Sequence, residues 1–297
     1  MLLTEFLNVA LDAKVMPVCS GTRNNWYLPA IADYRDCLGT DPRLEDMCRD
    51  RLNAWIDRRV SEGRLSCYTI KTRRGALLSI WRAAVEHDLL DVMPAKIRQV
   101  RMRRTNPTAW DRAEVQRLFS YSLHNMPDKR MPMTDLPQRV FFASLISAGY
   151  DTALRLGDLL SIEREWIRTD KEGAGWMSIQ QSKTGLLVAS RINPTTMGLI
   201  DRLMSTNSDR RLIWPLGFRR EALYRQFKRL VKQSGVRSGT FRFLRRASTT
   251  HVEMDAPGTA YRHAGHSDPA TTRRYYLDHE QLSGAVSPQA LDIIPPP

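Results

Sequence analysis

The segment Gly265-His266-Ser267-Asp268-Pro269-Ala270-Thr271-Thr272-Arg273-Arg274-Tyr275 carries the most specific pattern in this chain of 297 residues. A glycine and a histidine stand side by side, and a tyrosine follows ten residues after the glycine. A second tyrosine, Tyr276, comes directly after the first. Adjacent residues on a helix point about 100° apart. Only one of the two tyrosines can therefore face a given ligand.

Three earlier segments carry the cationic side chains that would act with a tyrosine. The stretch Thr152–Ile162 contains Arg155 and Asp158, which are three residues apart and therefore share one face of a helix. Lys183 lies in a Ser-Lys-Thr-Gly sequence that is typical of the turn of a β-hairpin. The sequence Arg242-Phe243-Leu244-Arg245-Arg246 opens a predicted helix.

The charge balance indicates a polyanionic partner. The chain has 45 Lys and Arg against 32 Asp and Glu, a net charge of +13. A hydrophobic fraction of 42% with 26% charged residues is normal for a globular protein and excludes wholesale disorder. A folded chain this basic most often binds a polyanion, and a basic surface kept for solubility is the alternative.

Several classes of protein are disfavoured by what the sequence lacks. It has no run of 18 apolar residues, so a membrane span is not expected, and its first residues make a poor signal peptide. Its cysteines have no CxxC spacing and no histidines nearby, which argues against a zinc site and a disulfide framework. We expect them to be small apolar residues in helices of a reduced protein: Cys19, Cys37, Cys48 and Cys67.

In this order and at these separations, the four segments resemble the tyrosine recombinase, or phage integrase, family of site-specific DNA recombinases. The resemblance covers residues 108–280 and extends more weakly to the N-terminal part, which is similar to that family's core-binding domain. It implies a mainly α fold with a small β-hairpin or sheet. A helical N-terminal bundle and an integrase-type catalytic domain would close as a clamp around duplex DNA.

The resemblance implies a catalytic set with one supporting carboxylate, Asp158, which would orient the first arginine. The set comprises Arg155, Lys183, Arg242, Arg245, His266 and Tyr275. Tyr275 is favoured over Tyr276 as the nucleophile because of its spacing from Gly265. It would attack the phosphate to form a 3′-phosphotyrosyl bond, with strand exchange proceeding through a Holliday junction.

Each residue type suits its part of this chemistry. Guanidinium groups such as those of Arg155 and Arg245 bind the non-bridging phosphate oxygens bidentately, which an ammonium group cannot do. Lys183 would protonate the leaving 5′ oxygen. His266 would hydrogen-bond a phosphate oxygen or move a proton.

Two positions depart from the family pattern. Arg242 stands where the pattern has histidine, and a guanidinium, which stays protonated, cannot accept the proton of Tyr275. The nucleophile would then be activated by the charge of the arginines, by His266 or by the phosphate itself. Ala153 stands where the pattern prefers glycine, and we expect this substitution to be tolerated.

We predict three regions: residues 1–93 as a helical DNA-binding domain, residues 94–110 as a basic linker, and residues 111–297 as the catalytic domain with a C-terminal tail. Only about twenty residues are expected before the first strong helix, which leaves no room for an additional arm-binding domain. In the first region, Ser20 or Thr22 would cap a helix that buries Trp26, Ala30, Tyr34 and Leu38. Further helices are predicted from Leu44 and from Ser66 to about Leu90.

The second half is predicted to alternate helices with one hairpin. Helices are expected at 111–124, 137–149, 157–162, 195–205 and 219–234. The hairpin would pair residues 176–181 with 186–192. The tail after Tyr275 carries the apolar residues Leu291, Ile293 and Ile294, and either docks on a neighbouring protomer or forms a loosely ordered terminus.

Basic residues outside the catalytic set are candidates for DNA contacts because phosphate binding dominates affinity for DNA. They lie on the third predicted helix, in the linker and on the helix at 219–234. The candidates are Lys71, Arg73, Arg74, Arg101, Arg103, Arg104, Arg219, Arg220 and Lys228.

The expected partner is double-stranded DNA with a specific recombination site, bound by a homotetramer on two duplexes and by no membrane. Away from DNA the protein is expected to be a monomer or dimer. No metal, nucleotide or organic cofactor is expected. We expect a cytoplasmic, nucleoid-associated enzyme of a mobile genetic element. Two alternatives stay open: DNA relaxation of the type IB topoisomerase kind, and a non-catalytic DNA-binding protein that retains the fold.

Overall fold

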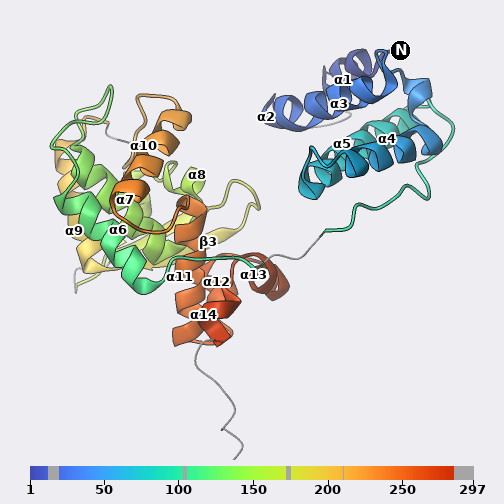
Figure 1. The fold of residues 1–297 in the computed structure, drawn as a ribbon. Helices are drawn as coiled ribbons and strands as arrows, with labels where there is room; N and C mark the ends of the chain where they lie inside the picture. The colour runs from blue at the N-terminus through green and yellow to red at the C-terminus, as the bar shows by residue number, and fades with distance from the viewer. Residues whose placement is uncertain (13–19, 103–105, 172–174, 210, 284–297) are drawn as a thin grey trace, which may run out of the picture. The chain divides into compact units, whose positions relative to one another are not determined.

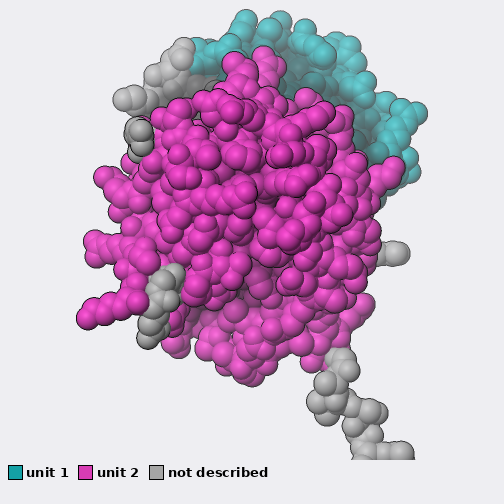
Figure 2. Space-filling view, turned by 90° about the vertical axis from the view of Figure 1, so that its left-hand side faces the viewer, with its two compact units in different colours: residues 1–104 teal, residues 105–297 magenta. Residues whose placement is uncertain are grey.

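A computed structural model of the protein describes residues 1–12, 20–102, 106–171, 175–209 and 211–283 (Figure 1). The chain divides into two compact units, Met1–Arg104 and Thr105–Pro297 (Figure 2). None of the helices within the described ranges is both long and apolar enough to cross a membrane. Cys19, Arg103, Arg104 and the apolar tail residues after Ser283 lie outside the described residues.

The first unit is a helical bundle, as predicted. Its helices are α1 (Leu3–Asp12), α2 (Ser20–Thr22), α3 (Leu28–Leu38), α4 (Arg49–Glu62) and α5 (Cys67–Glu86), with a 3₁₀ turn at Leu44–Asp46. Helix α5 begins next to Ser66, as predicted, and Ser66 caps it, since its Oγ accepts a hydrogen bond from the N–H of Thr69 at 3.1 Å. The helix ends at Glu86, short of the predicted Leu90.

Helix α1 was not predicted, although its sequence contains the signal. Leu3, Phe6, Leu7 and Ala10 are buried at the spacing of one helical face. The expectation that the first strong helix begins after about twenty residues is therefore wrong, because this short amphipathic segment packs against α3 and α5.

A π-helical turn at Arg23–Tyr27 joins α2 to α3 and changes which residues are buried. Such a turn adds one residue to the helical repeat and rotates the side chains that precede it. Trp26, predicted to be buried, is 49% exposed, while its neighbour Tyr27 is buried in its place. Ala30 and Tyr34, which follow the π turn, are buried as predicted.

Both ends of the predicted linker, residues 94–110, pack onto one of the two units. Ile97 and Val100 pack against the core of the first unit, and Arg74 donates hydrogen bonds to the carbonyls of Ile97 and Arg98. At the other end, Trp110 is fully buried in the second unit and donates to the carbonyl of Arg237 at 2.8 Å. The unit boundary lies between these two anchored ends.

Of the described cysteines, Cys37 and Cys67 lie in helices as predicted, in α3 and α5, whereas Cys48 does not. Cys37 and Cys48 are half-buried, and Cys67 is exposed at the first position of α5. All three are free thiols. Cys48 precedes α4 as its N-cap, so its position reflects a helix end rather than a helix interior.

The second unit is α-helical with one small sheet. Its helices are α6 (Arg112–His124), α7 (Gln138–Thr152), α8 (Leu156–Leu159), α9 (Pro194–Thr206), α10 (Arg220–Gln233), α11 (Phe241–Asp255), α12 (Ala260–His263), α13 (Pro269–Tyr275) and α14 (His279–Ser283). Asp111 caps α6 in a capping box with Glu114. The predicted helix at 157–162 forms only the single turn α8.

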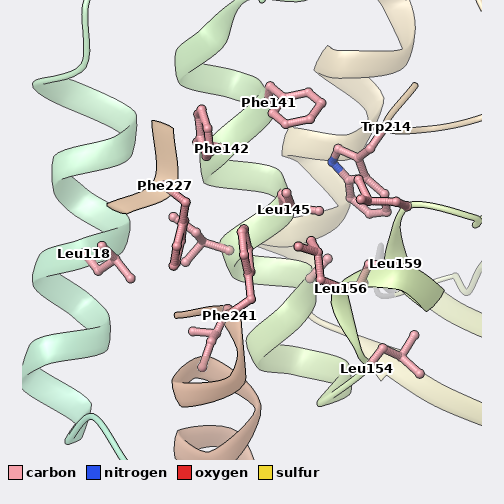
Figure 3. Packing of buried hydrophobic residues seen from close by; sticks show 14 of the residues in the cluster. Leu118, Phe141, Phe142, Leu145, Leu154, Leu156, Leu159, Trp214, Phe227 and Phe241 are labelled. Carbon is pink, nitrogen blue, oxygen red and sulfur yellow. The ribbon is translucent and has the colours of Figure 1, made fainter. Parts of the chain in front are cut away.

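The core of the second unit surrounds α7, which is buried on nearly all sides (Figure 3). Phe141, Phe142 and Leu145 of this helix are fully buried, and α6, α9 and α11 pack around it. Phe227 of α10 stacks on Phe241 of α11 with 3.8 Å between the ring centroids. This packing fixes the start of α11, the helix that carries Arg242 and Arg245.

The sheet is antiparallel with strand order β1-β2-β3, from β1 (Ile167–Thr169), β2 (Gly175–Gln180) and β3 (Leu187–Ile192). The predicted hairpin is formed by β2 and β3, with Gln180 paired to Leu187 at the turn. Strand β1 was not predicted, because three residues carry too short an alternation to recognise.

Candidate active site

The backbone between α7 and α8 places the first arginine. Ala153 ends α7 in the left-handed region at φ 51°, a conformation that glycine adopts without strain. Arg155 follows as the N-cap of α8. Its Nη1 donates to Oε1 of Gln181 at 2.7 Å and lies 3.7 Å from the Oδ2 of Asp158. Asp158 therefore pairs with Arg155, as the sequence suggested.

Arg245 is the most deeply placed cation of the site. Only 3% of it is exposed, and its Nη1 donates to the carbonyl of Ala153. Its Nη2 lies 2.8 Å from both the carbonyl oxygen of Ala264 and the Nε2 of His266. Burial, together with the charge of Arg155, lowers the pKa of Arg245 to about 10, so the group is still protonated at neutral pH. Its Nε is buried and has no hydrogen-bond partner among the described residues.

His266 is held as a neutral acceptor. Because the guanidinium of Arg245 can only donate, Nε2 of His266 must accept, and Nδ1 then donates to Oγ1 of Thr272 at 2.7 Å. Burial and the charges of Arg245 and Arg155 lower the pKa of His266 to about 4. The ring is therefore a poor proton acceptor, and its main contact fixes the direction of Arg245.

Tyr276, and not Tyr275, packs against these groups. Its ring centroid lies 4.5 Å from that of His266 and 5.0 Å from Cζ of Arg245. Burial raises the pKa of its phenol, but the charges of Arg245 and Arg155 outweigh burial and leave that pKa lowered. Tyr275 is 45% exposed at the end of α13, where the side chain of Arg274 covers its ring.

Lys183 lies exposed at the turn between β2 and β3, as predicted. Within the described part of the chain its ammonium group has no recorded partner. The turn is tied to α8 by Asp158, whose Oδ1 accepts from the N–H of Ser182 at 3.2 Å and from its Oγ at 2.7 Å. Asp158 thus connects the segment of Arg155 to the segment of Lys183.

Helix α11 presents two further cations. Arg242 is exposed one turn before Arg245 and contributes to lowering the pKa of Tyr276, after the larger effects of burial, Arg245 and Arg155. Arg246 donates from Nε to the carbonyl oxygen of Tyr275 at 3.2 Å and from Nη1 to that of Thr108 at 3.3 Å. Arg246 therefore anchors the backbone at the end of α13.

Comparison with known proteins depends on structure alone, since no protein-family model and no curated protein matches the sequence. A lambda integrase dimer bound to a core site matches with a TM-score of 0.69 and 19% identity over 99% of each chain. XerH recombinase in a post-cleavage complex matches with a TM-score of 0.71 and 17% identity over 92% of this chain and 83% of that one. The Tn1549 transposon integrase matches with a TM-score of 0.66 and 15% identity over 93% and 95%.

The chain has the tyrosine recombinase fold. The predicted fold class is therefore confirmed: a mainly α protein with a helical N-terminal unit and an integrase-type second unit that holds a small sheet. The candidate catalytic residues lie on the segments that the sequence pattern assigned to them. Of these residues, the structure brings Arg155, Arg245 and His266 together, with Arg242 and Lys183 exposed and Tyr275 turned outward.

Some of the predicted DNA-binding residues have structural partners in this recombinase fold. Arg73 forms an ion pair with the buried Asp33 at 3.0 Å, and Arg74 holds the segment of Ile97. The others within the described ranges are exposed: Lys71, Arg101, Arg219, Arg220 and Lys228. Lys228 lines a hollow of about 600 Å³ at the C-terminal part of α10, together with Arg225, Arg229 and Lys232.

Sequence reasoning missed three residues that position the candidate site. Gln181 and Thr272 are buried and hydrogen-bond to Arg155 and His266 respectively. The third, Arg246, anchors Tyr275. A polar residue at an inward-facing strand position was the available signal for Gln181, since β2 alternates buried and exposed residues up to the turn. No three His, Cys, Asp or Glu side chains in the described ranges are grouped to hold a metal ion.

Proposed function

We propose that the protein is a site-specific tyrosine recombinase that cleaves and rejoins double-stranded DNA. The observation that carries this proposal is the convergence of Arg155, Arg245 and His266 at one site beside a helix that ends in two tyrosines. The lambda, XerH and Tn1549 proteins of similar fold were solved with DNA, which supports DNA as the partner.

The proposed reaction exchanges one phosphodiester bond for another of similar energy. The phenolic oxygen of Tyr275 attacks the phosphorus, the bond to the 5′ oxygen breaks, and a 3′-phosphotyrosyl bond forms. Lys183 donates a proton to the departing 5′ oxygen. The 5′ hydroxyl of a partner duplex then attacks the phosphotyrosyl bond, which releases Tyr275 and builds a Holliday junction.

The arginines stabilise the charge that develops on the phosphate. Arg155 and Arg245 would donate to its non-bridging oxygens, with the free Nε of Arg245 as one donor. Arg242 would add a third positive charge at the same face. His266 acts by orienting Arg245, because a ring with a pKa of about 4 accepts a proton poorly at neutral pH. The proton of Tyr275 would pass to a phosphate oxygen.

Tyr275 must move to reach the phosphate. Its side chain is exposed, while the ring of Tyr276 covers Arg245. A turn of the segment at the end of α13 would withdraw Tyr276 and carry Tyr275 inward. The hydrogen bond from Arg246 to the carbonyl of Tyr275 lies at the pivot of this movement.

The proposed assembly is a homotetramer on two duplexes, with a monomer or dimer away from DNA. A lambda integrase tetramer bound to a Holliday junction has a similar fold, with a TM-score of 0.64, which supports this stoichiometry. Both units of the chain would grip the duplex, and the exposed basic residues of α10 and Lys71 would bind phosphates.

The test is covalent capture. The full chain is incubated with nicked duplexes whose central base pairs are randomised, the mixture is denatured in SDS, and DNA that stays attached to protein is sequenced. A recombinase gives a defined site at which the DNA becomes attached, and Arg155→Gln and Arg245→Gln abolish attachment. DNA binding without any attached DNA would contradict the proposal and favour a non-catalytic binding protein.

A strand-exchange assay distinguishes a recombinase from the remaining enzymatic alternative, a type IB topoisomerase-like enzyme. Two labelled duplexes carrying the recovered site are mixed with the protein. A recombinase joins strands of one duplex to the other, whereas a topoisomerase-like enzyme relaxes supercoils and leaves the two labels on separate molecules.

A further inference from the structure

Gln181 is a buried residue directly after β2, and its side chain contacts three segments of the candidate site. Only 1% of the residue is exposed. Its Oε1 accepts from Nη1 of Arg155 at 2.7 Å and from Oγ1 of Thr184 at 3.1 Å. Its Nε2 donates to the carbonyl oxygen of Ala264 at 3.4 Å. These bonds use both the acceptor and the donor end of the amide.

The amide links the two arginines through one shared acceptor. The carbonyl of Ala264 accepts from Nε2 of Gln181 and also from Nη2 of Arg245. A continuous chain of hydrogen bonds therefore runs from Arg155 through Gln181 and Ala264 to Arg245. The two guanidinium groups repel one another, since the charge of Arg155 is among the causes that, after burial, lower the pKa of Arg245. A neutral amide between them holds their separation without adding charge.

The same residue shapes the turn that carries Lys183. The backbone N–H of Gln181 donates to the carbonyl of Leu186, and its own carbonyl accepts from the N–H of Gly185, both at 2.8 Å. The side-chain bond from Thr184 closes the turn from the other side. Lys183 lies within this turn, so Gln181 holds the backbone that carries it.

The loop before His266 lies in close contact with the side-chain amide of Gln181. Gly265 has φ 63°, and a Cβ atom added there would lie 2.5 Å from Nε2 of Gln181 and 2.5 Å from Cγ2 of Val188. Only glycine allows this backbone conformation and this approach together. Gln181 and Gly265 therefore form a matched contact that sets the position of His266.

We propose that Gln181 is a positioning residue that fixes the separation of Arg155 and Arg245 and the turn of Lys183 for phosphate cleavage. The proposal rests on the proposed recombinase function. In this proposal the amide of Gln181 sets the distances between the groups that would bind the phosphate. Since misplacing a group by about 1 Å can cost about 100-fold in rate, loss of the amide has a large expected effect on cleavage and a small one on DNA affinity.

The variants compare two neighbouring glutamines. Gln181→Met keeps the length of the side chain and removes both hydrogen-bonding ends. Gln180→Met is the matched control, because the side chain of Gln180 lies on the opposite, exposed face of β2 and, among the described residues, donates only to the carbonyl of Gly185. On the DNA site captured by the wild type, Gln181→Met is expected to form the covalent adduct about 100-fold more slowly at unchanged DNA affinity. Gln180→Met cleaves at the wild-type rate.

A change of leaving group distinguishes positioning from general loss of structure. A 5′-bridging sulfur leaves as a thiolate, whose conjugate acid has a pKa of about 8.5, and therefore needs no proton from lysine. With this substrate, Lys183→Ala is expected to recover most of its cleavage. Gln181→Met is expected to recover only part, because its arginines stay displaced. Cleavage by Gln181→Met at the wild-type rate on both substrates would overturn the proposal. So would a loss of cleavage that matches an equal loss of DNA affinity.

A test without DNA separates failure of this inference from failure of the proposed function. Thermal unfolding is measured for Gln181→Met, for Arg155→Met and for the double variant of the full chain. If the amide holds Arg155, the double variant melts above the temperature given by the sum of the two single shifts. Additive shifts overturn the positioning role even where the wild type forms adducts. Non-additive shifts in a chain that forms no adduct leave Gln181 coupled to Arg155 and refute only the recombinase reaction.

Discussion

The guanidinium of Arg245 lies against the ring of Tyr276, with 5.0 Å between its Cζ atom and the ring centroid. Arg245 is also the residue that the proposed mechanism assigns to the phosphate. The tyrosine ring and a DNA phosphate would therefore compete for the same face of Arg245. Tyr276 would be displaced when DNA binds, and the adjacent Tyr275 would be free to enter.

The contact between Tyr276 and the arginines predicts that the phenol of Tyr276 loses its proton at a lower pH than a free tyrosine. Burial raises the pKa of Tyr276, but the charges of Arg245 and Arg155 lower it by more, so that the pKa lies below its usual value of 10.0. The ultraviolet difference titration of wild type against Tyr276→Phe should show a phenolate forming below pH 10. Arg155→Gln should move this titration to higher pH. A phenol that ionises above pH 10 would mean that Tyr276 does not lie at the arginines.

The buried neutral His266 predicts a loss of stability in acid. The unfolded chain binds a proton on this histidine below its ordinary pKa of 6.5, whereas the folded chain does so only near 4. Stability is therefore lost as the pH falls from 6.5 toward 4. Between pH 7 and pH 5 this histidine should cost about 2 kcal/mol of the free energy of unfolding.

Urea unfolding of the second unit at these two pH values measures the effect of His266. His266→Gln should have a shallower dependence on pH than the wild type, and His87→Gln, an exposed position of the first unit, should keep the full dependence. His263, whose pKa is also lowered to about 4 by burial and Arg245, and His251, whose pKa burial lowers too, supply the dependence that is left in His266→Gln. Equal slopes in His266→Gln and wild type would refute the assignment.

Ala153 predicts a stabilising substitution. A left-handed conformation strains any residue with a Cβ atom by about 1 to 2 kcal/mol, and Ala153 adopts it at φ 51°. Glycine removes this strain at some cost in unfolded-state entropy, so Ala153→Gly should stabilise the second unit by about 0.5 to 1 kcal/mol. Ala148→Gly, inside the same helix, should instead destabilise it by at least about 1 kcal/mol. Denaturant melts that show destabilisation by both variants would contradict the argument.

Substitutions of Arg73 and Lys71 should affect different properties, stability in the first case and DNA affinity in the second. Arg73 pairs with Asp33, which is buried and also contacts Arg59 at 2.7 Å, whereas Lys71 is exposed on the same helix. Arg73→Gln should lower the stability of the first unit by roughly 1 to 3 kcal/mol, because a buried carboxylate loses one partner. Lys71→Gln should leave the melting temperature unchanged and weaken DNA binding. A melting temperature unaffected by Arg73→Gln would show that the ion pair does not hold this helix.

The parts of the fold that follow local rules could be predicted from the sequence. The helix starts at Ser66 and Asp111 and the hairpin around Lys183 depend on neighbouring residues, and each lies at the expected place. The π turn before α3 could not be predicted, because the periodicity of Trp26, Ala30 and Tyr34 fits an unbroken helix equally well. Helix α1 depends on burial against α3 and α5, which a short segment does not reveal by itself.

The same distinction between local and long-range features holds for the candidate site. The cationic residues could be listed from motifs, but their contacts depend on which segments meet in space. Gln181 lies 26 positions from Arg155 and 83 from Ala264, and no local pattern reports such contacts. The order of the two tyrosines was predicted from spacing alone, which cannot show that the ring of Tyr276 covers Arg245.

The identity of the attacking tyrosine tests the central claim most directly. Protein bound covalently to its captured DNA site is digested, and the peptide that carries the nucleotide is sequenced by mass spectrometry, in wild type, Tyr275→Phe and Tyr276→Phe. The account predicts a nucleotide on Tyr275, no adduct in Tyr275→Phe, and an adduct that persists in Tyr276→Phe. An adduct on Tyr276 that persists in Tyr275→Phe and is lost in Tyr276→Phe would contradict it.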